Sequence, residues 1–204
     1  ASCLVGSEMC IRDRAASVTE PVKTDLAPIC ALGAAVPQSR TIGAVTLTEN
    51  AELGLASLAL RRGGAAPGLG FALPGPGGWA EGEGIAAFWT GPDQWMVEFP
   101  GRAASDVAAG LAGPGVSVTE QTDGFAAFEI AAPEPVLVAL MEKLVNVDPA
   151  RFGPGSATRC GFHHMSIFVI RRAADQLAVL GMRSAAGTIW HALANAAEQQ
   201  ETRA

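Results

Sequence analysis

Charged residues are scarce in this 204-residue chain, making up 17% of it against roughly 25% in an average soluble protein. Lysine and arginine form no run, and the formal net charge is −6. Because binding to nucleic acid needs clustered cations that displace counterions, these features exclude a nucleic-acid partner. Two explanations of the scarcity stay open. Partner subunits cover part of the surface, or the composition reflects a general bias toward Ala and Gly.

Long apolar runs are missing as well. None reaches the roughly 18 to 20 residues that a transmembrane helix needs, although 49% of the residues are hydrophobic. Arg12, Asp13 and Arg14 interrupt the first apolar residues before a signal peptide could form its apolar core. We therefore expect a cytoplasmic protein that contacts no membrane, and its length suffices for a substantial core.

Metal-ligand and nucleophile patterns are also lacking. The cysteines match neither a zinc set nor a CxxC pair; they are Cys3, Cys10, Cys30 and Cys160. His163 and His164 are adjacent, so in a strand they point to opposite faces. Cys160 lies near His163, but no third group orients them, which favours a buried structural cysteine. We expect no catalytic and no metal-binding residue here.

A dinucleotide fingerprint, GxGxxA, is formally present at residues 75–80. That motif requires a strand before it and a helix that begins on its glycines. Pro74 and Pro76 flank the first glycine, and Glu81 and Glu83 follow where the helix should begin and would repel a pyrophosphate. We therefore predict that this chain binds no cofactor.

The chain divides into three parts. Residues 1–14 show no recognisable pattern and are predicted to be a non-native leader. Residues 15–40 contain prolines without sustained periodicity, which predicts a flexible N-terminal arm. Residues 41–199 are predicted to form the domain, with half-units of about 45–121 and 122–199.

The rest of the domain is organised around a predicted hairpin at residues 85–99. Its turn, residues 91–94, contains Gly-Pro-Asp-Gln. Along the second strand Trp95, Val97 and Phe99 share one face.

Further elements follow from apolar periodicity and turn residues. Strands are predicted at residues 41–50, 53–60, 116–121, 125–130, 158–171 and 176–180. For 53–60 a helix is the alternative, and 158–171 is either one bent strand or two. Helices are predicted at residues 102–111, 133–145 and 184–199. Ser105 or Asp106 is expected to cap the first helix and Ser184 the last, with a helical turn near 66–71. Asp123-Gly124 predicts a hairpin turn. The order of elements predicts an α+β fold of two ferredoxin-like βαββα units, in which the hairpin at 85–99 corresponds to 167–180.

Five segments, in order, resemble the gamma subunit of heterotetrameric sarcosine oxidase, and together they cover about residues 47–197. They are FWTGPDQWMV (88–97), VTEQTDGF (118–125), LMEKLVNVD (140–148), FGPGSATR (152–159) and LGMRSAAG (180–187).

The resemblance implies a fold similar to the folate-binding domain of the glycine-cleavage aminomethyltransferase. It also implies a cytoplasmic complex with alpha, beta and delta subunits that oxidatively demethylates sarcosine to glycine. The co-products are hydrogen peroxide and either formaldehyde or 5,10-methylenetetrahydrofolate. FAD, FMN, NAD and tetrahydrofolate are then expected on partner subunits, and this chain is expected to be a non-catalytic structural subunit.

Two alternatives stay open: a stand-alone folate-binding or one-carbon transfer protein of the same fold, and an interaction module of another oxidase. Folate-dependent relatives carry a Lys-x-Cys-Tyr-x-Gly-Gln-Glu type motif, whose lysine and terminal Gln-Glu are absent from residues 154–161, which argues against the first. The candidate interface residues are Trp89, Trp95, Arg171 and Arg172. For the two arginines, solvated charges at a strand end are the default interpretation.

Overall fold

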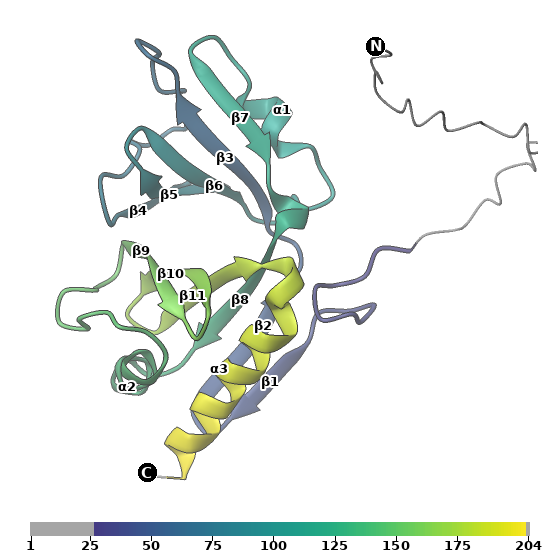
Figure 1. Ribbon diagram of the computed structural model, residues 1–204, viewed down its shortest axis with the longest axis vertical. Helices are drawn as coiled ribbons and strands as arrows, with labels where there is room; N and C mark the ends of the chain where they lie inside the picture. The colour runs from purple at the N-terminus through teal and green to yellow at the C-terminus, as the bar shows by residue number, and fades with distance from the viewer. Residues whose placement is uncertain (1–26, 203–204) are drawn as a thin grey trace, which may run out of the picture.

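The computed structural model describes residues 27–202, which form two antiparallel sheets and three α-helices (Figure 1). Sheet A has the strand order β1-β2-β8-β11-β10-β9, and sheet B the order β4-β5-β6-β3-β7. The strands of sheet A are β1 (Ser39–Ile42), β2 (Val45–Asn50), β8 (Phe125–Ala131), β9 (Ser156–Phe162), β10 (Met165–Ala173) and β11 (Gln176–Met182). Those of sheet B are β3 (Gly54–Leu60), β4 (Trp79–Gly82), β5 (Ile85–Gly91), β6 (Gln94–Phe99) and β7 (Val116–Glu120). The helices are α1 (Val107–Leu111), α2 (Glu134–Leu144) and α3 (Ala186–Glu201), with short 3-10 turns η1 (Thr122–Gly124) and η2 (Arg183–Ala185).

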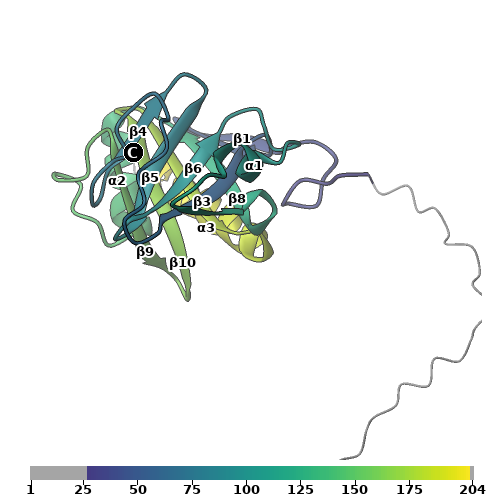
Figure 2. The ribbon, with the colours of Figure 1, turned by 90° about the horizontal axis from the view of Figure 1, so that it is seen from above.

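The elements stack in four layers. Helices α2 and α3 cover the outer face of sheet A, sheet B lies on its inner face, and α1 covers the far side of sheet B (Figures 1 and 2). A buried apolar cluster fills each of the three spaces between layers. Between the sheets the Phe88 and Phe168 rings lie with centroids 5.1 Å apart. The central strands β3, β8 and β11 are therefore covered on both faces, which explains why they read as nearly continuous apolar runs. None of the helices within residues 27–202 is both long and apolar enough to span a bilayer.

The predicted repeat is present in the topology. The first unit runs β3, a loop, β4, β5, β6 and α1, and the second runs β8, α2, β9, β10, β11 and α3. The corresponding strand orders, β3-β6-β5-β4 and β8-β11-β10-β9, are the same. The hairpin β5–β6 thus corresponds to β10–β11, as predicted. Each unit holds one strand before this hairpin. In the first unit it is β4, predicted as loop, and in the second it is β9, because residues 158–171 form two strands, one of the two predicted alternatives.

The chain crosses between the sheets twice. Strand β2 belongs to sheet A and the next strand, β3, to sheet B, whereas β7 belongs to sheet B and β8 to sheet A. The prediction of a hairpin turn at Asp123-Gly124 is therefore wrong, because β7 and β8 do not pair with each other. Instead η1 carries the crossing, and it is held to β3 because the Thr122 hydroxyl accepts a hydrogen bond from the Leu55 backbone N–H at 2.9 Å.

Several local predictions also need correction. Residues 66–71 form a loop instead of a helical turn, and β4, predicted as loop, is a strand that begins at Trp79 directly after the glycines of the rejected fingerprint. Asp106 caps α1, as one of the two predicted alternatives, and accepts a hydrogen bond from the Ala109 N–H at 3.0 Å. Ser184 does not cap α3, because the chain first makes the turn η2 and Ala185 occupies the cap position.

The predicted leader, residues 1–14, and the first part of the predicted arm lie outside the described residues. The remainder, residues 27–40, lies against the domain. The carboxylate of Glu49, only 3% exposed, accepts hydrogen bonds from the backbone N–H groups of Leu32 at 2.9 Å and Gln38 at 3.1 Å. One buried side chain thus anchors both ends of this segment.

Strand β6 has the predicted alternation. Trp95, Val97 and Phe99 pack toward α1, whereas Met96 and Glu98 face sheet A. Trp95 is 9% exposed, and its indole N–H donates to the carbonyl oxygen of Pro74 at 2.8 Å. The ring therefore pins the loop before β4 onto sheet B.

We expect Trp95→Ala to lower the free energy of unfolding by about 3–5 kcal/mol, because it opens a cavity and removes the hydrogen bond to the Pro74 carbonyl oxygen. Urea unfolding of the isolated chain measures this. Trp89→Ala, at a half-buried ring on the paired strand β5, is the control and should cost less. A Trp95→Ala chain of unchanged stability that no longer assembles with partners would instead place Trp95 at an interface.

Candidate functional site

Arg172 lies at the centre of an ion-pair cluster between the two sheets. Its guanidinium on β10 contacts Glu98 on β6 through two hydrogen bonds of 2.8 and 3.1 Å. It also contacts Glu129 on β8 through two hydrogen bonds of 3.2 Å. The Glu98 side chain is fully buried, and that of Arg172 is 16% exposed. Because the Arg172–Glu98 pair joins sheet A to sheet B, we call these residues the inter-sheet clamp.

Two neighbours complete the clamp. The indole N–H of Trp79 donates to Glu98 at 2.8 Å, and the Arg172 guanidinium lies 5.5 Å from the centroid of the Trp79 ring. The Asn50 amide donates to Glu129 at 3.2 Å. Burial lowers the pKa of the Arg172 guanidinium, but the charges and hydrogen bonds of Glu98 and Glu129 raise it by more, so the net pKa lies above its ordinary value. Arg172 is thus a permanent cation inside the domain.

The default interpretation of Arg171 and Arg172 as solvated charges is therefore wrong. Strand β10 lies between two other strands and is covered on both faces, so the Arg171 side chain is buried and that of Arg172 is mostly buried. Arg171 points to the helix side, where its side chain is 2% exposed and lies 3.5 Å from the Glu134 carboxylate. It also donates to the carbonyl oxygen of Ala174, and burial lowers its pKa. Sequence reasoning missed Glu98, Glu129 and Trp79, whose roles depend on contacts between distant strands.

The structure does not bring the four candidate interface residues together. Trp95 and Trp89 belong to the cluster beneath α1, on the far side of sheet B from the two arginines. A role at a subunit interface stays a prediction for all four.

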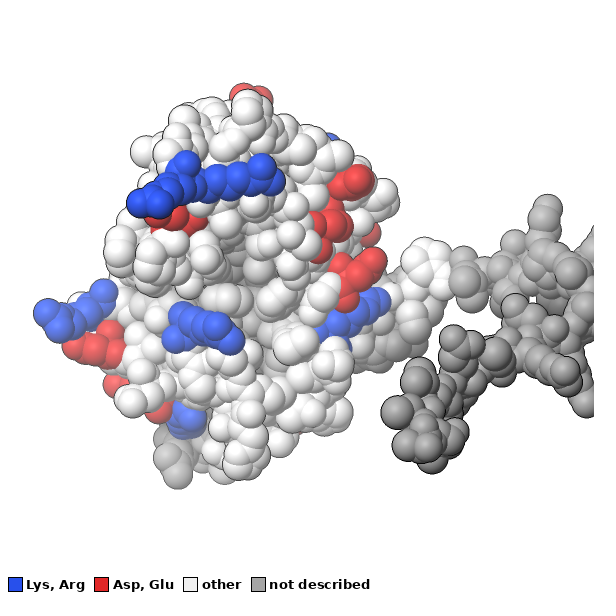
Figure 3. Space-filling model, turned by 45° about the horizontal axis from the view of Figure 1, so that its top comes forward, with Lys and Arg blue, Asp and Glu red and all other residues white. Residues whose placement is uncertain are grey.

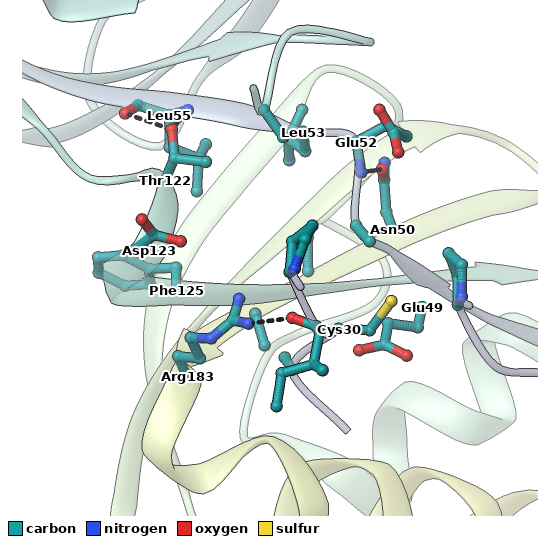
Figure 4. A pocket seen from close by; sticks show the side chains of 18 of the residues that line it. Cys30, Glu49, Asn50, Glu52, Leu53, Leu55, Thr122, Asp123, Phe125 and Arg183 are labelled. Carbon is teal, nitrogen blue, oxygen red and sulfur yellow. Dashed lines mark hydrogen bonds between the residues drawn. The ribbon is translucent and has the colours of Figure 1, made fainter. Parts of the chain in front are cut away.

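A hollow with a mixed polar and apolar lining, the junction cavity, lies where the chain crosses between the sheets (Figure 4). It encloses about 290 Å³ between residues 28–37, the end of β2, η1 and Arg183. The Arg183 guanidinium donates to the carbonyl oxygen of Ile29 at 2.6 Å. The Cys30 thiol lies beside the Glu49 carboxylate (Figure 4). Desolvation, with the nearby charge of Glu49, raises the pKa of Cys30, so this thiol is not an activated nucleophile.

A second, more apolar hollow, the inter-sheet cleft, lies on the other side of Phe125 and encloses about 540 Å³. Its apolar lining comes from both sheets: Met96 from sheet B, and Phe125, Met165, Phe168 and Met182 from sheet A. Arg159 and His164 also line it, and the Arg159 guanidinium lies 5.9 Å from the centroid of the Phe168 ring. On the face that Figure 3 shows, most of the surface is uncharged, and several of the blue and red groups lie next to each other. This arrangement suits binding of an apolar group and supplies no acid–base pair.

The remaining candidate chemistry lies around the turn between β9 and β10. His163, with a positive φ of 51°, and His164 occupy that turn, and burial raises the pKa of the Cys160 thiol to about 11. Cys160 is therefore protonated at neutral pH. Within residues 27–202, no three His, Cys, Asp or Glu side chains lie close enough together to hold a metal ion.

We expect Arg172→Met to lower the free energy of unfolding by about 3–5 kcal/mol, because it leaves Glu98 as a buried, unpaired charge. The double variant Arg172→Met/Glu98→Gln removes that charge and should recover part of the loss. Urea unfolding of both single variants and the double variant forms a double-mutant cycle. Strictly additive effects would contradict the clamp.

We expect Cys160 to react with iodoacetamide at pH 8 about two orders of magnitude more slowly in the folded chain than in the unfolded one. The thiolate is the reactive form, and the raised pKa of Cys160 leaves little of it. Since the folded pKa is about 11, the rate should rise about tenfold per pH unit between pH 8 and 10. Mass spectrometry of the Cys160 peptide measures it, with the chain in guanidinium chloride as control. Equal rates would refute the assignment.

No protein-family model matches the sequence, and no curated protein matches it. Solved structures do match the fold. A chain of the heterotetrameric sarcosine oxidase from Corynebacterium sp. U-96, in complex with pyrrole 2-carboxylate, aligns with a TM-score of 0.62 and 20% identity, over 79% of this chain and 88% of that chain. The glycine cleavage system aminomethyltransferase T from Bartonella henselae aligns with a TM-score of 0.52 and 12% identity, over 72% of this chain and 44% of that chain.

The chain thus spans less than half the length of the aminomethyltransferase but most of the sarcosine oxidase chain. At these identities the likeness is one of fold. The predicted fold class is confirmed: this is an α+β chain folded like the folate-binding domain of aminomethyltransferase and like a chain of heterotetrameric sarcosine oxidase.

Proposed function

We propose that this chain is a non-catalytic structural subunit, of the gamma type, in a heterotetrameric sarcosine oxidase. The observation that carries the proposal is the fold match over 88% of a chain from such an enzyme. The chemistry of the described residues supports it. The buried charges Glu98 and Arg172 pair with each other, and the Cys160 thiol has a pKa of about 11.

In the proposed complex, the alpha, beta and delta subunits are the partners, and alpha and beta carry FAD, FMN, NAD and tetrahydrofolate. Sarcosine, oxygen and water would give glycine, formaldehyde and hydrogen peroxide. With tetrahydrofolate in place of water, the one-carbon product would be 5,10-methylenetetrahydrofolate. The contribution of this chain is to stabilise the assembly, which we place in the cytoplasm.

The alternative function is a stand-alone folate-binding or one-carbon transfer protein. The inter-sheet cleft favours it in one respect, because its volume of about 540 Å³ lies in the range of small-molecule pockets. Calorimetric titration of the isolated chain with tetrahydrofolate separates the two functions. The structural role predicts no saturable heat, and micromolar binding would favour the alternative.

We expect the affinity-tagged chain, co-expressed with candidate alpha and beta flavoprotein subunits of a sarcosine oxidase, to co-purify with them in a fixed stoichiometry. Size-exclusion chromatography and flavin absorbance measure this. Sarcosine-dependent oxygen consumption should appear in the complex and be absent from the isolated chain. A monodisperse chain that does not bind the flavoproteins would refute the proposal.

A further inference from the structure

We infer that the inter-sheet cleft is the docking site for a segment of a partner subunit that combines apolar side chains with a carboxylate. The inference rests on the proposed function, and adds to it which face of the chain meets a partner and what chemistry that partner presents.

The lining of the cleft is adaptable. Three of the five methionines of the chain, Met96, Met165 and Met182, line it, together with the rings of Phe125 and Phe168. Methionine is unbranched and polarisable, so a methionine-lined surface can repack around an incoming side chain. Such a lining accepts aliphatic or aromatic side chains without a rigid match of shape.

The charge of the cleft selects for a carboxylate. Among the described residues that line it, Arg159 and His164 are the titratable ones, and none is Asp or Glu. This is notable in a chain with a formal net charge of −6. Arg159 is held in place because its Nε donates to the Ser166 hydroxyl at 2.9 Å. Its remaining guanidinium N–H groups can donate to a carboxylate at the mouth of the cleft.

Two large apolar side chains near the cleft, Met182 and Ile29, are exposed, which favours a protein segment over a small ligand. Met182, 60% exposed, stands at its edge. The next residue, Arg183, binds the carbonyl oxygen of Ile29, which is itself 59% exposed. Large apolar side chains this exposed are costly in water, and a partner that covers them removes that cost.

Two charge changes in the cleft test the inference: Met182→Glu and Arg159→Glu. Each has a matched control outside the cleft, Val36→Glu at an exposed apolar residue and Arg62→Glu at an exposed arginine. Tagged variants are co-expressed with the flavoprotein subunits, and the flavin that co-purifies per chain is measured. We expect each cleft variant to retain about a tenth or less of the wild-type flavin and both controls to retain nearly all of it. Urea unfolding verifies that the variants fold.

The outcomes separate the two proposals. Wild-type chain that recovers no flavoprotein refutes the proposed function, and the docking site with it. If wild type assembles and the folded cleft variants assemble equally well, the docking site is refuted while the proposed function stands. A further arm uses the dye 1-anilinonaphthalene-8-sulfonate, which should bind the cleft of the isolated chain and be excluded from it in the complex. If the complex binds as much dye as the isolated chain, and this binding depends on Met182, the cleft is a small-molecule site instead.

Discussion

The ion pair between Arg172 and Glu98 is the constraint on which the arrangement of the two sheets depends. A fully buried carboxylate is tolerable only with a paired, hydrogen-bonded cation, and here the two partners come from different sheets. Sliding one sheet against the other would leave Glu98 unpaired, whereas the apolar contacts around Phe88 and Phe168 would tolerate a shift more readily. The clamp therefore fixes the register in which the two halves of the domain face each other.

The two crossings of the chain also hold the two sheets together. Strands β1 and β2 precede β3 in the chain but belong to sheet A, so the chain passes from sheet A to sheet B after β2 and returns to sheet A after β7. Sheet A therefore combines two strands from the first part of the chain with the strands of the second unit, and the two sheets are joined by these connections as well as by packing. The segment anchored by Glu49 closes the region beside these crossings, and this arrangement creates the junction cavity.

The number and placement of the charged residues also bear on function. The chain has few charged residues, and several of them pair with each other inside the domain, which leaves the inter-sheet cleft apolar with a basic edge. A surface of this kind is typical of a protein that is covered by a partner. The proposed docking site rests on this distribution of charge, which also agrees with the proposed role as an assembly subunit.

The sequence by itself determined most of the local structure. The hairpin at 85–99, its alternation at Trp95 and Val97, and the repeated order of elements could be predicted, because strand periodicity and turn chemistry are encoded within a few residues. Tertiary structure alone decided the rest. Asp123-Gly124 looks like a hairpin turn but carries a crossing between sheets, and Arg172 looks like a solvated charge but lies in the clamp with Glu98 and Glu129. In both cases the neighbouring residues do not decide the outcome. The partners of Arg172, for example, lie on strands 43 and 74 residues away in the sequence, which a window of neighbouring residues does not contain.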